Sequence, residues 1–149
     1  MKIVISHINT DFDALASMIA AAKLHPGFVP VFTGSEEPNV REFLMIYGKI
    51  FNVMKSKDVS PAEVSEAIIV DTQDPSRLGK FSGIVAGGGI KLTVYDHHAE
   101  RAGAAPGVPS GARKIIRDYG STVTILLEEI FMKKIKITKA EATLFALGI

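Results

Sequence analysis

The chain has 149 residues, of which 47% are apolar and none is cysteine. This length and composition fit one domain with one hydrophobic core, and they exclude disulfides and thiolate metal sites, so any metal must be held by histidine and carboxylate groups. The net charge of +1 does not call for a nucleic-acid or membrane partner, no apolar run approaches the roughly 20 residues of a membrane span, and the absence of cysteine is compatible with the cytoplasm, where we expect the protein.

The first half of the chain alternates short β-branched runs with apolar residues at helical spacing. The opening run leads directly into a polar loop, which is typical of a strand and not of a signal peptide. Pro26-Gly27 ends the first helical pattern, and Gly48 closes the second. In chain order, the pattern predicts a strand over 2–6, a helix over 12–24, a strand over 28–32, a helix over 39–47 and a strand over 50–54.

The second half continues the alternation and contains two capping boxes, in which Ser60 or Thr138 is followed three residues later by glutamate. Gly87-Gly88-Gly89 lacks the Gly-Lys-Ser/Thr ending of a phosphate loop, so a flexible turn is the better interpretation. The expected elements are a short helix from 60, a strand over 67–70, a coil or turn over 77–81, a strand over 91–95, a loop over 99–111, an edge strand over 113–118, a helix over 121–134 and a final helix from 138.

Strands separated by helices predict an α/β fold with a mostly parallel, Rossmann-like sheet and helices on both faces. In such sheets, ligands bind beyond the carboxyl ends of the strands. Three groups of polar residues follow three of the predicted strands, namely 7–13, Asp71 and 96–98. The fold would therefore bring residues from distant parts of the chain to one edge of the sheet.

These residue types suit a pair of divalent metals that bind a phosphoryl group and activate a water molecule. Asp11 and Asp13 could face two neighbouring metals, Asp71 could bridge them and His97 could complete one side. Each residue alone has a simpler interpretation, because aspartate often caps a helix or ends a strand and a His-His pair often lies in a surface loop. Their shared position at predicted strand ends favours the metal site.

Four segments together resemble the motifs of the DHH phosphoesterase family. The segment 7–17 is similar to its first motif, with a histidine followed by Asp-x-Asp-Ala, and Val70-Asp71-Thr72 to its second. Asp96-His97-His98 is the third motif, which gives the family its name, and Gly120 to Thr124 resembles the Gly-Ser-Thr segment that opens the following helix. The resemblance covers the whole chain and implies a hydrolase of phosphodiester or phosphoanhydride bonds.

The resemblance also implies roles for individual residues. Two metal ions are expected, Mn²⁺ in the first place with Mg²⁺, Co²⁺ or Zn²⁺ as alternatives, held by His7 and Asp11, by Asp13 and His97, and by Asp71 between them. The catalytic residues would be His98, which touches the substrate phosphate, and Asp96, which orients the neighbouring metal-binding histidine. Substrate contacts are expected at Arg101, Ser121 and Thr122, although plain helix capping explains the last two equally well.

One departure from the family pattern lies at Leu147-Gly148-Ile149. In the family, a Gly-Ile segment leads within a few residues to a further aspartate that ligates the second metal, and a separate C-terminal domain follows. We therefore expect residues 1–149 to be a DHH domain truncated just before that motif, with a weak second metal site and with activity that is low or nil.

A closer resemblance is to the N-terminal DHH module of bacterial proteins that also carry CBS domains and a poly(A) polymerase or tRNA nucleotidyltransferase domain. It rests on 11–17, on Phe32 to Ser35 and on Asp71-Thr72 with Pro75-Ser76-Arg77 nearby. The implied partners are a phosphate-containing small molecule or short oligonucleotide, and RNA bound through other domains of the parent protein. The alternatives are a non-catalytic nucleotide or metal sensor and an inorganic pyrophosphatase.

Overall fold

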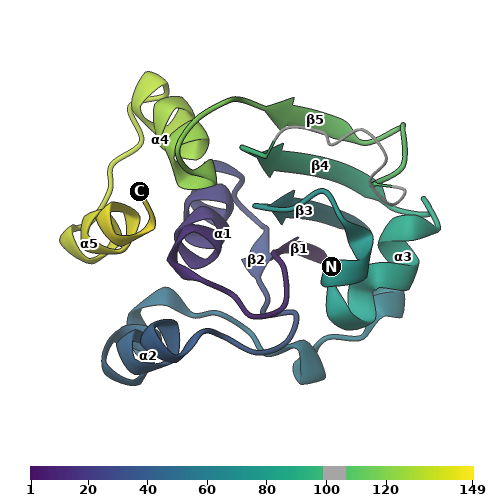
Figure 1. Cartoon of the computed structure of the whole chain (residues 1–149), viewed down its shortest axis with the longest axis horizontal. Coiled ribbons are helices and arrows are strands. Elements are labelled where there is room, and N and C mark those ends of the chain that lie inside the picture. Colours follow the sequence, from purple (N-terminus) through teal and green to yellow (C-terminus); the bar gives the residue numbers. More distant parts are fainter. Residues whose placement is uncertain (99–106) are drawn as a thin grey trace.

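In a computed structural model, which describes residues 1–98 and 107–149, a parallel sheet of five strands forms the centre of the molecule (Figure 1). The strand order is β2-β1-β3-β4-β5, and every pairing is parallel. The strands are β1 (Lys2–Ile5), β2 (Val29–Pro30), β3 (Glu66–Val70), β4 (Lys91–Asp96) and β5 (Arg113–Ile116). The α/β class with a parallel sheet, predicted from the sequence, is confirmed.

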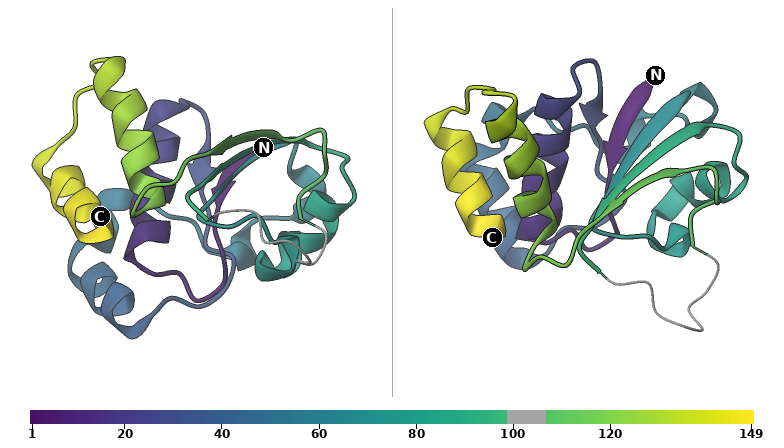
Figure 2. Two further views of the ribbon diagram at one scale, coloured as in Figure 1. Left: turned by 45° about the horizontal axis from the view of Figure 1, so that its top comes forward. Right: turned by 90° about the horizontal axis from the view of Figure 1, so that it is seen from above.

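Helices cover both faces of the sheet, as Figure 2 shows from two sides. One face carries the long helices, which are α1 (Phe12–Leu24), α2 (Pro38–Phe51), α4 (Thr122–Met132) and α5 (Lys139–Gly148). The other face carries α3 (Ser82–Ala86) and the 3-10 helices η1 (Ser56–Asp58), η2 (Pro61–Glu63), η3 (Pro75–Arg77) and η4 (Gly79–Phe81).

The two faces have separate cores, because neighbouring residues of a strand point to opposite sides of the sheet. Val4 and Ile68 pack toward the long helices, whereas Ile3 and Ile69 pack toward the 3-10 helices and α3. Burial on both faces explains why β1 and β3 are continuous apolar runs after their first residue.

The predicted strand over 50–54 is wrong. The helix α2 passes through Gly48, ends at the buried Phe51, and gives way to Asn52 with a left-handed φ of 44°. Phe43 and Phe51 are eight residues apart on the same side of α2, and their rings stack with centroids 5.9 Å apart. This packing keeps the last turns of α2 helical. Within 50–54, only Met54 forms a β-bridge, to Val31.

One of the two predicted capping boxes forms. Thr138 accepts from the Glu141 backbone N–H at 3.2 Å, and the Thr138 N–H donates to the Glu141 carboxylate at 2.6 Å. The box predicted at Ser60 is wrong, because Pro61–Glu63 is a single 3-10 turn without a side-chain cap. Only two residues separate this turn from β3, which leaves no room for an α-helix.

The segment over 77–81 was expected to be a coil or turn and consists of 3-10 turns, whereas the short helix α3 that follows it was not predicted. The glycine run 87–89 ends α3, with Gly88 in the left-handed region at a φ of 66°, and leads into β4 as the turn interpretation expects. Among the described residues, no helix has both the length and the apolar content that crossing a lipid bilayer requires.

Candidate metal centre

The candidate site lies where β1, β3 and β4 end side by side. The register pairs Ile5 with Ile69 and Val70 with Tyr95, so the carboxyl ends of the three strands are level. The chain leaves β1 for its neighbour β2 on one side and later returns to β3 on the other side. The carboxyl ends of the neighbouring strands β1 and β3 thus form the switch point of the sheet, where open α/β folds bind their ligands.

Asp71 lies at the centre of this site. It directly follows β3, is 3% exposed, and has a left-handed φ of 60°. Its Oδ2 atom is 3.4 Å from Nε2 of His7, whereas its Oδ1 atom is 3.5 Å from Nε2 of His97. The Thr122 hydroxyl also donates to Oδ1, at 2.9 Å. Asp71 therefore presents one oxygen to each side of the switch point.

The first side consists of His7, Asp11 and Asp71, whose possible ligand atoms lie within 4.8 Å of one another. Nδ1 of His7 is 2.9 Å from the Ile8 carbonyl, an arrangement that directs Nε2 toward the carboxylates. Asp11 is the N-cap of α1, because its Oδ1 accepts from the Ala14 N–H at 2.9 Å, while its Oδ2 is 3.9 Å from Nε2 of His7. Asp11 therefore caps α1 with one oxygen and lies beside His7 with the other.

The second side consists of Asp71, His97 and His98, which also meet within 4.8 Å. Nδ1 of His97 is 2.9 Å from the Tyr119 carbonyl, which directs Nε2 toward Asp71 and toward Asp13 Oδ2 at 3.7 Å. The other four predicted ligands are thus brought together around Asp71.

Both carboxylate oxygens of Asp13 accept hydrogen bonds from other parts of the protein. Its two oxygens accept from the backbone N–H groups of Thr122 and Val123, at 2.8 and 2.9 Å, and its Oδ1 also accepts from the Ser17 hydroxyl at 3.1 Å. These N–H groups lie in the first turn of α4, where backbone donors lack partners inside the helix. Asp13 therefore joins the start of α1 to the start of α4.

The ionisation of the site reflects crowded carboxylates. Burial, together with the charge of Asp71, raises the pKa of Asp13 to about 6. The hydrogen bonds from the Thr122 and Val123 N–H groups lower this pKa but do not outweigh burial. Burial would raise the pKa of Asp71 as well, but hydrogen bonds from His7 and Thr122 outweigh it and lower that pKa. Burial would lower the pKa of His7, and its bonds to Asp71 and Ile8 reverse the direction. Such concentrated negative charge between imidazoles favours a bound cation.

Asp96 and His98 form a pair at the mouth of the site. Asp96 is 1% exposed, and its Oδ1 is 2.7 Å from Nδ1 of His98, whose side chain is 53% exposed. Asp96 was expected to orient the metal-binding histidine, but its contact in the structure is with His98, while the Tyr119 carbonyl holds His97. The amide of Gln73 donates to the other oxygen of Asp96 at 3.0 Å.

The predicted substrate contacts differ in their surroundings. Thr122 is fully buried and donates its hydroxyl to Asp71, and the Ser121 hydroxyl lies 2.8 Å from the Thr124 hydroxyl and makes no side-chain cap. Arg101 lies outside the described residues. The contributions of Gln73 and Tyr119 were not predicted, because a single glutamine and a backbone carbonyl have no motif of their own.

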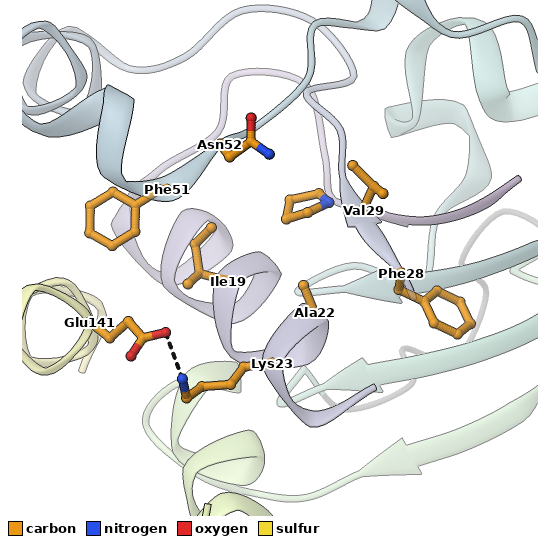
Figure 3. A pocket seen from close by; sticks show the side chains of 9 residues that line it. Ile19, Ala22, Lys23, Phe28, Val29, Phe51, Asn52 and Glu141 are labelled. Atoms are coloured by element: carbon orange, nitrogen blue, oxygen red, sulfur yellow. Dashed lines mark hydrogen bonds and ion pairs between the residues drawn. The ribbon is translucent and has the colours of Figure 1, made fainter. Parts of the chain in front are cut away.

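A shallow pocket of about 350 Å³ lies away from this site (Figure 3). It is lined by the second half of α1, the end of α2, β2 and α5. An ion pair of 2.9 Å between Lys23 and Glu141 connects α1 to α5 beside it. None of the five predicted metal ligands lines this pocket.

The comparisons with known proteins agree with the motifs. The family model described as "DHH family, N-terminal domain" matches residues 2–149. A curated relative, the A-adding tRNA nucleotidyltransferase of Geobacter sulfurreducens, is 38% identical over 150 residues; the match covers 100% of this chain but only 17% of that relative.

A solved structure has the same fold. It is an exopolyphosphatase-related protein from Bacteroides fragilis, which superposes with a TM-score of 0.76 at 16% identity, over 99% of this chain and 44% of the other. At this identity the likeness concerns the fold alone.

Proposed function

The chain belongs to the DHH family, and on that premise we propose that it is the metal-binding domain of a phosphoesterase that hydrolyses phosphodiester or phosphoanhydride bonds. One observation carries the proposal. The carboxylate of Asp71 faces His7 and Asp11 with one oxygen and His97 and His98 with the other. A shared carboxylate of this kind is what a pair of neighbouring divalent metals requires.

The donor set fits such a pair. We propose that His7 and Asp11 hold one ion, that Asp13 and His97 hold the other, and that Asp71 contacts both. Imidazole nitrogen combined with carboxylate oxygen suits Mn²⁺, Fe²⁺, Co²⁺ or Zn²⁺ better than Mg²⁺, and we propose Mn²⁺. When bound, the ions supply charge stabilisation and an activated water at neutral pH. Asp13 Oδ2, the oxygen that faces His97, already accepts from the Thr122 N–H, so an ion there would share this oxygen with a backbone donor, and we expect the second position to bind more weakly.

The remaining polar residues act around the ligands. His98 is half-exposed, and Asp96 holds its Nδ1, so Nε2 is the ring nitrogen available to a substrate phosphate. The Thr122 hydroxyl is committed to Asp71, and we propose that it steadies this carboxylate and does not touch the substrate. A contact from Arg101 to phosphate remains a prediction.

The substrate class follows from the relative more than from the site. The curated relative is a tRNA nucleotidyltransferase, and this chain corresponds to about a sixth of its length. We propose that the domain belongs to a larger RNA-processing protein and acts on a short oligonucleotide or a small phosphate compound. The transferase chemistry and any RNA-binding or CBS domain would lie in other parts of that protein.

Activity assays separate hydrolysis from the alternatives. A longer polypeptide that continues past Ile149 should hydrolyse short oligonucleotides with Mn²⁺, and its Asp71→Asn variant should lose activity at least a hundredfold. Faster cleavage of pyrophosphate than of oligonucleotides would favour a pyrophosphatase. Absence of turnover with bound metal would favour a sensor.

Metal binding is tested separately on this chain. Calorimetric titration should show that Mn²⁺ binds and that Asp71→Ala abolishes binding at both positions, because both would share this carboxylate. Asp58→Ala is the matched control, since Asp58 is an exposed carboxylate on η1 outside both clusters. Unchanged Mn²⁺ binding by Asp71→Ala would refute the shared-ligand assignment.

A further inference from the structure

We propose that Gln73 is a positioning residue, which fixes the Asp96 carboxylate and thereby the tautomer and orientation of His98. Gln73 lies two residues after Asp71, in the loop between β3 and η3. Its role in turnover rests on the function proposed above, whereas its effect on the His98 ring does not.

The side-chain amide of Gln73 has both of its hydrogens engaged. Nε2 donates to Oδ2 of Asp96 at 3.0 Å and to the backbone carbonyl of His98 at 2.9 Å. Both partners are acceptors only, so rotating the amide would place Oε1 against two other oxygens. The hydrogen-bond chemistry therefore fixes which end of the amide faces Asp96.

The other end of the amide supports the same interpretation. Oε1 is buried and has no hydrogen-bond partner among the described residues. Among the described residues, the side chain therefore interacts only through its two donated bonds. The anchoring of the loop is a separate matter, because Val108 donates to the Gln73 backbone carbonyl and would do so with any side chain.

The consequence for His98 follows from the two oxygens of Asp96. Gln73 engages Oδ2, so Oδ1 is left to face His98, where it accepts from Nδ1 at 2.7 Å and lies 3.3 Å from the backbone N–H. An acceptor at Nδ1 places the proton of a neutral ring there and leaves Nε2 for a ligand. Without Gln73, the carboxylate could rotate and the His98 ring could turn with it.

Two variants test this chain of contacts. Gln73→Glu keeps the shape but replaces the donors by oxygen, and Gln73→Leu removes all hydrogen bonding. Ser76→Ala is the matched control, because Ser76 is an exposed residue three positions along the same segment. Thermal melting shows which variants are folded. If Gln73→Leu does not fold, Gln73→Glu alone carries the test.

The first readout is ¹⁵N NMR of the histidine rings in the metal-free protein at pH 8. We expect the wild type and Ser76→Ala to show His98 protonated at Nδ1, and both Gln73 variants to show a mixture of tautomers. An unchanged His98 spectrum in a folded Gln73→Glu variant would overturn the proposal, whatever happens to activity.

The second readout is turnover with Mn²⁺ by the longer polypeptide of the hydrolysis assay, carrying the same substitutions. Loss of an outer hydrogen-bond partner typically costs about ten- to a hundredfold, and we expect this loss in kcat with KM within about twofold of wild type. A loss confined to KM would also overturn the positioning role. If the longer polypeptide without a substitution does not turn over, the proposed function fails, and the NMR measurement still decides the role of Gln73.

Discussion

Asp13 has a carboxyl group whose pKa is raised to about 6 by burial and by the charge of Asp71. A pKa that is higher in the folded than in the unfolded chain means that protonation stabilises the fold. For Asp13 this stabilisation is present below about pH 4 and is lost as the pH rises through about 6. Over that window we expect the metal-free wild type to lose on the order of 2 kcal/mol of unfolding free energy relative to Asp13→Asn.

Urea unfolding in the presence of a chelator, at intervals from pH 4 to pH 7, measures this difference. Asp58→Asn should follow the wild type at every pH, because its exposed side chain lies outside the site. If the unfolding free energies of wild type and Asp13→Asn changed with pH in parallel, ionisation of Asp13 would not be what destabilises the metal-free protein.

At the scale of single residues, the sequence alone could predict the members of the candidate site that belong to a motif. The five predicted ligands meet because they follow strand ends, and the sheet makes those ends neighbours. Gln73 and the Tyr119 carbonyl could not be predicted, because their roles depend on which loop lies against which strand end. The partner of Asp96 also depends on ring orientation, which spacing does not determine.

Gly148 controls how closely α5 packs against α1, two contacting helices that are labelled next to each other in Figure 1. A Cβ atom at this position would lie 2.6 Å from Ala16 Cβ and 3.0 Å from the Phe12 carbonyl. Gly148→Ala must therefore push α5 outward, and overpacking of this kind typically costs about 1–3 kcal/mol. Chemical denaturation measures the loss.

Two further variants separate overpacking from a general effect of glycine substitution. Gly111→Ala should change stability by less than about 0.5 kcal/mol, because nothing lies within 4 Å of a Cβ there. Ala16→Gly removes the nearest clashing atom but itself costs about 1 kcal/mol inside a helix, so the double variant should lose less stability than the sum of the two single variants. Losses that simply add would mean that contacts to the α1 backbone dominate.

At the scale of elements, long periodic helices and apolar strands were predictable, and the errors arose where packing overrides local pattern. The segment after Gly48 has strand-like composition, but the aromatic contacts of Phe43 and Phe51 keep it helical. The helix α3 has five residues, too few for an apolar period to appear in the sequence. Its Val85 nevertheless fills the core on the second face of the sheet.

At the scale of the molecule, the sequence predicted a parallel sheet but not the order of its strands. That order places the switch point between β1 and β3, and it decides that the His7 and Asp71 ends become neighbours. Both halves of the site are therefore held by the sheet itself, so metal binding and global folding should be thermodynamically linked.

This linkage gives a prediction for the whole chain. A ligand that binds only the folded state at a hundred times its Kd adds about 2.7 kcal/mol of stability, which for this chain length corresponds to a rise in Tm of about 5–10 °C. We expect Mn²⁺ to give such a rise in calorimetry and Ca²⁺ at equal concentration a smaller one, because imidazole ligands disfavour Ca²⁺. His7→Ala and His97→Ala should each reduce the rise, since each removes a donor from one side of Asp71. An equal rise in the Asp71→Asn variant would place the stabilising ion elsewhere on the surface and would separate metal binding from the switch point of the sheet.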